Sequence, residues 1–375
     1  MKLNLVNLGV LAASMLIFAS CNNDDDDIDV PEIPEIVVPD TFSFSVDGSS
    51  TVSFGGQTDR LTMATEIFSE LDATQSTVTK EDLRAMFNDG KGFSTAALND
   101  SGKKLGNKVG AYQTAEVKAN VILFFDDILV DFADNVAPVL GNDAAAGVAG
   151  MSGGNRQLNA KGVELDQAFA KGLIGALCVD QIANGYLSDA KIGDAVDNET
   201  RDPSEDSNAT AMEHHWDEGY GYVYGLESNA DVSDILLKKY LDKDGADSGY
   251  EGYSADVTDA FIYGRAAIVA KNSEVRDAQA AIISEKISEV VINKAVYYLN
   301  SAAGKDDLSA DYFHALSEGY GFIFSLQFTY DAAGAPYFTN AEVTGMLDEL
   351  LEGDGFWDRT DAELEAMATT IAAKL

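Results

Sequence analysis

The three histidines of this 375-residue chain all lie in two short segments that share one pattern. The pattern is His-x-x-x-Glu-Gly-Tyr-Gly, at residues 214–221 and again at residues 314–321. On a helix, a His and a Glu four positions apart lie on the same face, so each copy offers one imidazole and one carboxylate together. Such groups bind zinc, iron or manganese. The repeated pattern therefore marks these segments as the first candidates for a metal or ligand site.

Two arrangements of a divalent metal or iron are open. If the copies pack about a pseudo-two-fold axis, their four metal-binding side chains could converge: His214, Glu218, His314 and Glu318. The first copy could also hold a metal alone through His215 and Glu218, together with Glu213 or Asp217. The competing interpretation is structural, because a buried His bonded to a Glu satisfies two polar groups in a helical core.

Signatures of catalysis are missing from the sequence. The His-Glu-x-x-His pattern of zincin peptidases does not occur, and no Gly-rich phosphate loop follows a strand. Cys178 lies among apolar residues, where we expect it in the core. Arg265 stands inside an apolar helical stretch, and we expect it to pair with a carboxylate in the core, with an anion-binding role as the alternative. We therefore assign no catalytic residue.

Helices must position both motifs. Each motif follows an apolar helical stretch that ends in Tyr-Leu, residues 173–187 in the first copy and 287–299 in the second. This likeness predicts an internal repeat of about residues 160–230 and 274–330. We therefore expect residues 41–375 to form one all-α domain, a duplicated helical bundle.

Some further elements can be placed around the repeat. Residues 42–46 and 51–54 alternate about Asp47-Gly48, which predicts a small N-terminal β-hairpin. Thr79, followed by an acid at position 82, is typical of a helix start. An apolar helix is expected over residues 117–132, and a flexible glycine-containing stretch follows it.

The N-terminal residues indicate export. Residues 1–20 read as a signal peptide, and the ending Phe18-Ala-Ser-Cys21 resembles a bacterial lipobox, which implies cleavage and lipidation at Cys21. Residues 21–40 form an acidic, Pro-spaced tether, whose run of four aspartates looks like the export signal of Bacteroidota surface lipoproteins. We expect the chain to be lipid-anchored in the outer membrane and to face the cell exterior.

The composition limits the partners. The chain has 25 Lys and Arg against 63 Asp and Glu, for a formal charge of −38. A nucleic-acid partner is therefore not expected, because a phosphate backbone requires a basic surface. Hydrophobic residues make up 46% of the chain, which is enough for a packed core.

Four segments carry a resemblance to a known family: Thr210–Gly221, Gly264–Ile268, Arg276–Gln279 and His314–Glu318. They resemble the Bacteroidota lipoprotein family called domain of unknown function DUF 4856, from about Phe42 to the C-terminus. More distantly, a lipid-anchored, duplicated helical chain is similar to the imelysin-like proteins. Those are two-bundle α-folds of iron-acquisition systems, and His215-Trp-Asp-Glu218 has their His-x-x-Glu spacing.

The leading hypothesis is a non-catalytic cell-surface lipoprotein for nutrient acquisition. Its ligand would be iron, haem or another cation, and an outer-membrane uptake protein could be its partner. One alternative is a metal-dependent hydrolase of the imelysin type, with Glu213 or Glu218 as general base. Another is a structural docking module of an uptake complex.

Overall fold

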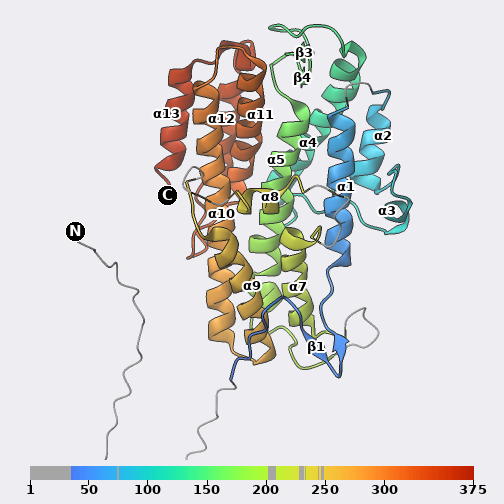
Figure 1. Cartoon of the computed structure of the whole chain (residues 1–375), viewed down its shortest axis with the longest axis vertical. Coiled ribbons are helices and arrows are strands. Elements are labelled where there is room, and N and C mark those ends of the chain that lie inside the picture. The colour runs from blue at the N-terminus through green and yellow to red at the C-terminus, as the bar shows by residue number, and fades with distance from the viewer. Residues whose placement is uncertain are drawn as a thin grey trace, which may run out of the picture. The chain divides into compact units, whose positions relative to one another are not determined.

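The computed structural model describes residues 35–73, 76–201, 208–227, 232, 234–243, 245 and 249–375. The predicted signal peptide, Cys21 and the tether up to residue 34 lie outside these residues. The described chain is mostly helical, as predicted (Figure 1). The longer helices are α1 (Gly55–Leu71), α4 (Ala115–Asp131), α5 (Leu165–Leu173), α7 (Ala211–Tyr224), α9 (Tyr253–Val269), α10 (Ser273–Ala303), α11 (Ala310–Ser325), α12 (Asn340–Leu351) and α13 (Asp361–Ala372).

Shorter elements connect these helices. The short α-helices are α2 (Lys80–Arg84), α3 (Ala96–Asp100), α6 (Asp189–Ile192) and α8 (Leu237–Leu241). Wider π-helical turns cover Ala85–Asp89, Phe132–Val136 and Ile174–Tyr186, and 3₁₀ turns cover Ala137–Val139, Leu326–Phe328 and Gly355–Asp358. Among the described residues, no helix is long and apolar enough to cross a membrane.

Two small hairpins accompany the helices. Strand β1 (Ser45–Val46) pairs antiparallel with β2 (Ser49–Ser50), which confirms the predicted hairpin. Its turn residues Asp47 and Gly48 both have positive φ, 51° and 81°, as a tight hairpin turn requires. The glycine-containing stretch after α4 forms a second hairpin from β3 (Gly150–Ser152) and β4 (Arg156–Leu158), where the sequence suggested only a flexible connection.

The helix starts follow from local sequence. The predicted cap at Thr79 is confirmed as a reciprocal capping box, in which the Thr hydroxyl accepts from the backbone of Asp82 and the Asp carboxylate accepts from the backbone of Thr79. Thr210 begins α7 in the same way through Glu213. Each such box satisfies two backbone donors that a helix end leaves open. The cap of α7 thus fixes where the first motif begins.

One long helix runs through the middle of the bundle. It consists of α5 and its π-helical continuation Ile174–Tyr186, and nearly all of its side chains are buried, including Cys178. A helix whose side chains are buried on all sides must be covered by neighbours on all sides. It packs against α11, α7, α1, α4 and α10. The helix approaches α11 closely at Gly175, where an added methyl group would lie 2.5 Å from Cβ of Ser325.

The second long helix, α10, completes the frame. It packs against α9 and α11, which neighbour it along the chain, and against the C-terminal helix α13 (Figure 1). Because α10 continues for 31 residues, it reaches both ends of the bundle. Of the two motif helices, α11 packs on both long helices, whereas α7 packs on the central helix and on α9.

Candidate functional site

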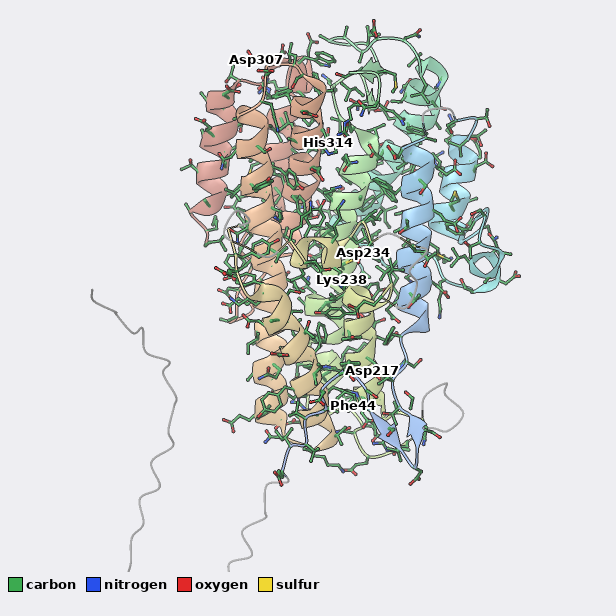
Figure 2. The ribbon with its side chains drawn as sticks, in the orientation of Figure 1. Phe44, Asp217, Asp234, Lys238, Asp307 and His314 are labelled. Carbon is green, nitrogen blue, oxygen red and sulfur yellow. The ribbon has the colours of Figure 1, made fainter. Side chains whose placement is uncertain are left out.

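The two copies of the repeated motif lie in different parts of the bundle. α11 packs on α5, whereas α7 packs on the continuation Ile174–Tyr186 of the same long helix. Figure 2 shows His314 in the upper half of the view and Asp217 near its lower end. Among the described residues, no hydrogen bond or ion pair joins one motif to the other. The structure therefore does not bring the two His/Glu pairs into one set.

Each motif makes the same contact with the helix that precedes it. A methyl group added to Gly219 would lie 3.6 Å from Cβ of Tyr186, and one added to Gly319 would lie 3.5 Å from Cβ of Tyr298. These tyrosines end the two Tyr-Leu stretches that the sequence comparison aligned. The parallel contacts agree with an internal duplication, which stays an interpretation of the sequence.

In the first copy, Glu218 is surrounded by neutral donors. Gln57 Nε2 and Tyr186 OH donate to its Oε1 over 2.8 and 3.1 Å. His214 Nε2 lies 3.9 Å from its Oε2, and the His214 side chain is 39% exposed. This pair offers one imidazole and one carboxylate at the rim of the bundle.

His215 does not join that pair. Its Nδ1 lies 2.8 Å from the backbone oxygen of Lys191, and a carbonyl can only accept, so this nitrogen carries the proton. Its Nε2 lone pair then faces Lys191 Nζ at 3.4 Å. Burial lowers the pKa of His215, which keeps the ring neutral. A metal at Nε2 would have to displace the lysine ammonium.

In the second copy, His314 lies between two carboxylates. Its Nδ1 is 2.6 Å from Glu164 Oε2, and its Nε2 is 3.6 Å from Glu318 Oε2. The two carboxylates approach opposite sides of the ring. A metal ion on one imidazole nitrogen therefore could not contact both carboxylates. Glu164 precedes α5 and was not predicted, because no spacing links it to the motif 150 residues away.

Buried partners hold Glu318. Lys171 Nζ lies 3.1 Å from its Oε1, and Tyr240 OH donates to the same oxygen over 3.1 Å. Burial alone would raise the pKa of Glu318, but Lys171 holds that pKa below its ordinary value. Lys171 also bonds Gln167, which donates to Asp166 over 2.5 Å. Burial, reinforced by Glu164, raises the pKa of Asp166 to about 7.

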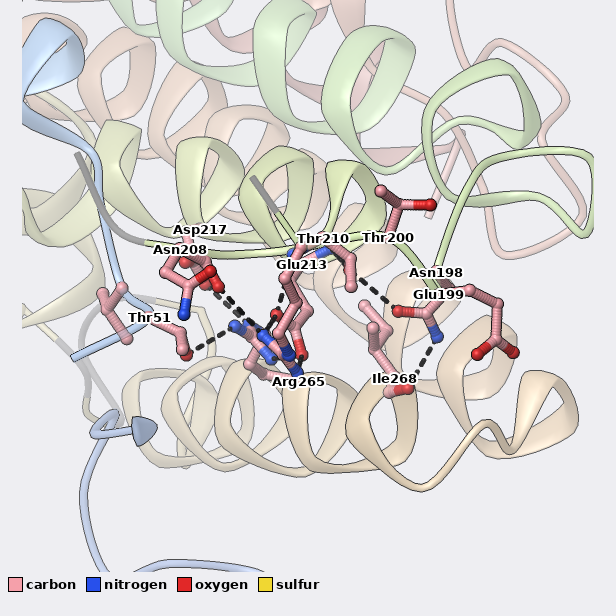
Figure 3. Close-up of polar contacts among 12 residues, drawn as sticks. Thr51, Asn198, Glu199, Thr200, Asn208, Thr210, Glu213, Asp217, Arg265 and Ile268 are labelled. Carbon is pink, nitrogen blue, oxygen red and sulfur yellow. Dashed lines mark hydrogen bonds and ion pairs between the residues drawn. The ribbon is translucent and has the colours of Figure 1, made fainter. Parts of the chain in front are cut away.

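The remaining predicted ligands of the first motif belong to an arginine cluster (Figure 3). Arg265 is fully buried; its Nε lies 2.8 Å from Asp217 Oδ1, and its Nη1 lies 3.3 Å from Glu213 Oε1. Arg201 also binds Glu213, because its Nη1 and Nη2 donate to Oε2 and Oε1 of that carboxylate over 2.6 and 2.8 Å. Burial raises the pKa of Asp217 to about 7, although Arg265 opposes this. Arg265 therefore has carboxylate partners in the core, and Glu213 and Asp217 face it.

The same cluster fastens the N-terminal hairpin to the bundle. Arg265 Nη2 donates to the Thr51 hydroxyl over 3.2 Å, and its guanidinium carbon lies 4.8 Å from the ring centre of Phe44. The backbone N–H of Ser53 lies 3.4 Å from Asp217 Oδ2. These contacts give Arg265 a structural role that links the hairpin, α7 and α9.

The predicted metal ligands other than His214 are thus bonded to other partners, and His214 has Glu218 at 3.9 Å. In the described ranges, no group of three or more His, Cys, Asp and Glu side chains is arranged to hold a metal ion. The binding of a metal or iron stays a prediction of the sequence, and the side-chain geometry points to a different kind of site.

A cavity of about 440 Å³ opens beside the second motif. His314 and Glu318 line it from α11, and Lys294 and Tyr298 line it from α10. The remaining lining side chains come from α10, α11 and two loops: Lys243, Tyr297, Ser301, Lys305, Asp311 and Ala315. Its volume lies in the range of small-molecule sites.

Lysine is the residue type that the sequence analysis missed. Lys294 has 2% of its surface exposed and lies 5.0 Å from the ring centre of Tyr297. Burial, with the charge of Lys243, lowers the pKa of Lys294 to about 8. Isolated lysines inside apolar stretches, such as Lys171 and Lys294, could have indicated these buried ammonium groups.

The comparisons with known proteins identify the chain by its family alone. No curated protein and no solved structure matches it. The family model described as Domain of unknown function (DUF4856) matches residues 39–375, which include the two motifs, the arginine cluster and the cavity. The chain therefore belongs to the DUF4856 family.

Proposed function

We propose that this chain is a ligand-binding protein that holds a small anionic molecule in the cavity beside α10 and α11. The observation that supports the proposal is the set of three lysines, Lys243, Lys294 and Lys305, lining one cavity of a chain that carries a formal charge of −38. Among the described lining residues, the opposing carboxylates are Asp311 and Glu318.

The charge of Glu318 is already compensated by two residues that do not line the cavity. Lys171 forms an ion pair with it, and Tyr240 donates to the same oxygen. The ammonium groups of the cavity therefore raise the local potential, which favours phosphate, sulfate or carboxylate groups over a bare cation. Haem and many iron chelates carry carboxylates, so they belong to the ligand classes to be tested.

The rest of the ligand would meet aromatic surface. Tyr297 is 43% exposed, and its ring packs edge-to-face on that of Tyr298, with ring centres 5.1 Å apart. A ligand with a flat or apolar part can bury it on such rings while its anionic group contacts the lysines. The pattern of charged anchors and an aromatic wall is typical of binding, and we assign no reacting group.

Lipid anchoring at Cys21 and display on the cell surface are also proposals, as is a distant imelysin-like relation. They rest on the lipobox and the acidic run of the sequence, and on the helical fold with its repeated motif. Substituting Cys21→Ser should abolish labelling by a radioactive fatty acid and release the protein from membranes. Labelling that persists in the variant would refute the anchor.

Calorimetric titration of the purified chain tests the binding proposal. The probes are inorganic phosphate, citrate and haem, with Zn²⁺ and Fe³⁺ as the cation arm. Lys305 is exposed at the cavity rim, so Lys305→Met should leave the fold intact and weaken anion binding by about tenfold, as expected for a lost charge-assisted hydrogen bond.

A matched control separates a site from general charge. Lys91 is exposed and lies on another part of the bundle, so Lys91→Met changes the net charge equally and should leave the affinity unchanged. Equal weakening by the two substitutions would show non-specific attraction and reject the proposal. Binding of metal ions alone would favour the cation hypothesis instead.

A further inference from the structure

A group of cationic side chains lies far from the cavity, around the first motif. It consists of Arg60 in α1, Lys103 and Lys108 between α3 and α4, and Lys191 in α6. The charges that act on Lys108 come from the other three members and from Glu218. We call these four residues the basic cluster.

Short distances connect the basic cluster to the first motif. Lys108 Nζ lies 3.4 Å from the hydroxyl of Tyr186, which in turn donates to Glu218. Lys191 Nζ lies 3.4 Å from His215 Nε2. Two members of the basic cluster therefore lie beside the first copy of the motif. The second copy of the motif lines the cavity.

The other two members of the basic cluster, Lys103 and Arg60, also lie close to each other. The Cβ position of Gly56 lies 3.2 Å from Lys103 Nζ and 3.6 Å from Arg60 Nη1, so the two cationic groups are within about 7 Å of each other. Arg60 is 7% exposed and donates to the backbone oxygens of Gly56 and Lys104. Carbonyl oxygens satisfy its hydrogen bonds without neutralising its charge.

The cluster has fewer counter-charges than cations. Across the described ranges, none of its four members has a carboxylate oxygen within 4.0 Å, in a chain with 63 acidic residues. Glu218 is the acid that faces Lys108, and its Oε1 already accepts from Gln57 and Tyr186. Asp59 is a second acid, because the charges of Lys103 and Arg60 act on it. Four cations near two carboxylates cost stability, because like charges repel at short range. The burial of Lys108 and the charge of Arg60 accordingly lower the pKa of that lysine.

An unsatisfied hydroxyl gives a second indication of a ligand. Tyr222 has 1% of its surface exposed, and its OH has no hydrogen-bond partner among the described residues. The charge that acts most on this hydroxyl is that of Arg60, and its ring stacks on Tyr186 at 6.0 Å. A buried hydroxyl without a partner is uncommon in native proteins and calls for an explanation.

We propose that the basic cluster, with the buried hydroxyl of Tyr222, is a second anion site that binds a phosphate-type or carboxylate group. This site stands on its own residues and does not depend on the function proposed for the cavity. A bound oxyanion would balance the remaining excess of positive charge and would accept from lysine, arginine and tyrosine donors. The duplicated motif would then support one anion site in each copy.

Counting binding equivalents tests the second site. The full chain is titrated with pyrophosphate by isothermal calorimetry, and we expect two equivalents for the unmodified protein. Lys108→Met should remove one equivalent or weaken it by more than about tenfold, whereas Lys305→Met should affect the other. Lys91→Met is the charge-matched control that should change neither. Circular dichroism melts verify that each variant folds.

The outcomes separate the two proposals. One equivalent that is lost with Lys305→Met and kept with Lys108→Met would overturn the second site and leave the cavity proposal standing. One equivalent that is lost only with Lys108→Met would support the second site and reject the cavity. If Lys108→Met fails to fold, Lys191→Met carries the same test, because Lys191 is only partly buried. Weakening by Lys91→Met equal to that by Lys108→Met would reject a specific site.

Discussion

Replacing Arg265 by methionine should weaken the folded state strongly and in a pH-dependent way. The substitution keeps most of the side-chain volume and removes the ion pairs with Asp217 and Glu213, the hydrogen bond to Thr51 and the contact with Phe44. Glu213 retains Arg201 as a bidentate partner. The main effect is therefore that Asp217 loses its counter-charge inside the core.

The structure sets the magnitude. Asp217 is fully buried, and after the substitution its remaining donor is the backbone N–H of Ser53 at 3.4 Å. Removing one partner of a buried ion pair costs about 3–5 kcal/mol. We expect this loss at pH 8, where the carboxylate is charged. The same change in an exposed pair is the control, because Arg84 and Asp126 are partly exposed and Arg84→Met should cost about 1 kcal/mol or less.

The sign of the pH dependence follows from the pKa of Asp217. That pKa is about 7, above the ordinary value of 3.8, so the group stabilises the fold at low pH and this contribution is lost as pH rises through 7. Without Arg265 the carboxyl group would protonate even more readily. At pH 5 the variant can keep Asp217 neutral, and we expect its loss to shrink to about 1–2 kcal/mol.

Urea unfolding followed by circular dichroism measures these differences. The unmodified chain, Arg265→Met and Arg84→Met are compared at pH 5 and pH 8. A loss at pH 8 that is no larger for Arg265→Met than for Arg84→Met would refute the argument. A large loss that is equal at the two pH values would show that packing, rather than the charge of Asp217, dominates.

Glycine substitutions in α7 and α9 should have opposite signs: Gly264→Ala places a methyl group 2.1 Å from Cζ2 of Trp216 and should cost about 1–3 kcal/mol. Gly219→Ala meets nothing closer than 3.5 Å and should stabilise by up to about 1 kcal/mol, so equal losses in urea melts would contradict both expectations. Anion binding in the cavity should weaken as pH rises through about 8, the pKa of Lys294; calorimetry that finds the same affinity at pH 7 and pH 9 would exclude a role for this ammonium. Because burial raises its pKa, Cys178 should react with a thiol reagent only upon unfolding, and fast labelling of the native protein would argue against its core position.

Local sequence patterns predicted most of the secondary structure. Apolar periodicity located the helices, Thr79 marked a helix start, and Asp47-Gly48 marked the hairpin turn. Each of these depends on residues only a few positions apart, which a sequence displays directly. The hairpin after α4 was missed because its strands, Gly150–Ser152 and Arg156–Leu158, are three residues long and mix glycine with polar residues.

The site was harder to predict because its partners are distant in sequence. Glu164 and His314 are 150 positions apart, and Glu213 and Asp217 face Arg265 rather than a metal. The helical spacing placed His and Glu on one face correctly, but it could not tell which other elements that face would meet. Those neighbours depend on how the helices cross, which is a property of the packed core.

Both motif copies depend structurally on one shared element, the central helix. The N-terminal part of the central helix serves α11, through Gly175 and Lys171, and its C-terminal part serves α7, through Tyr186. A fragment that ended after α7 would strand the Lys171 ammonium in an apolar face without Glu318. The two motif copies therefore belong to one cooperative unit, and we expect that neither would fold in a fragment that lacks the other.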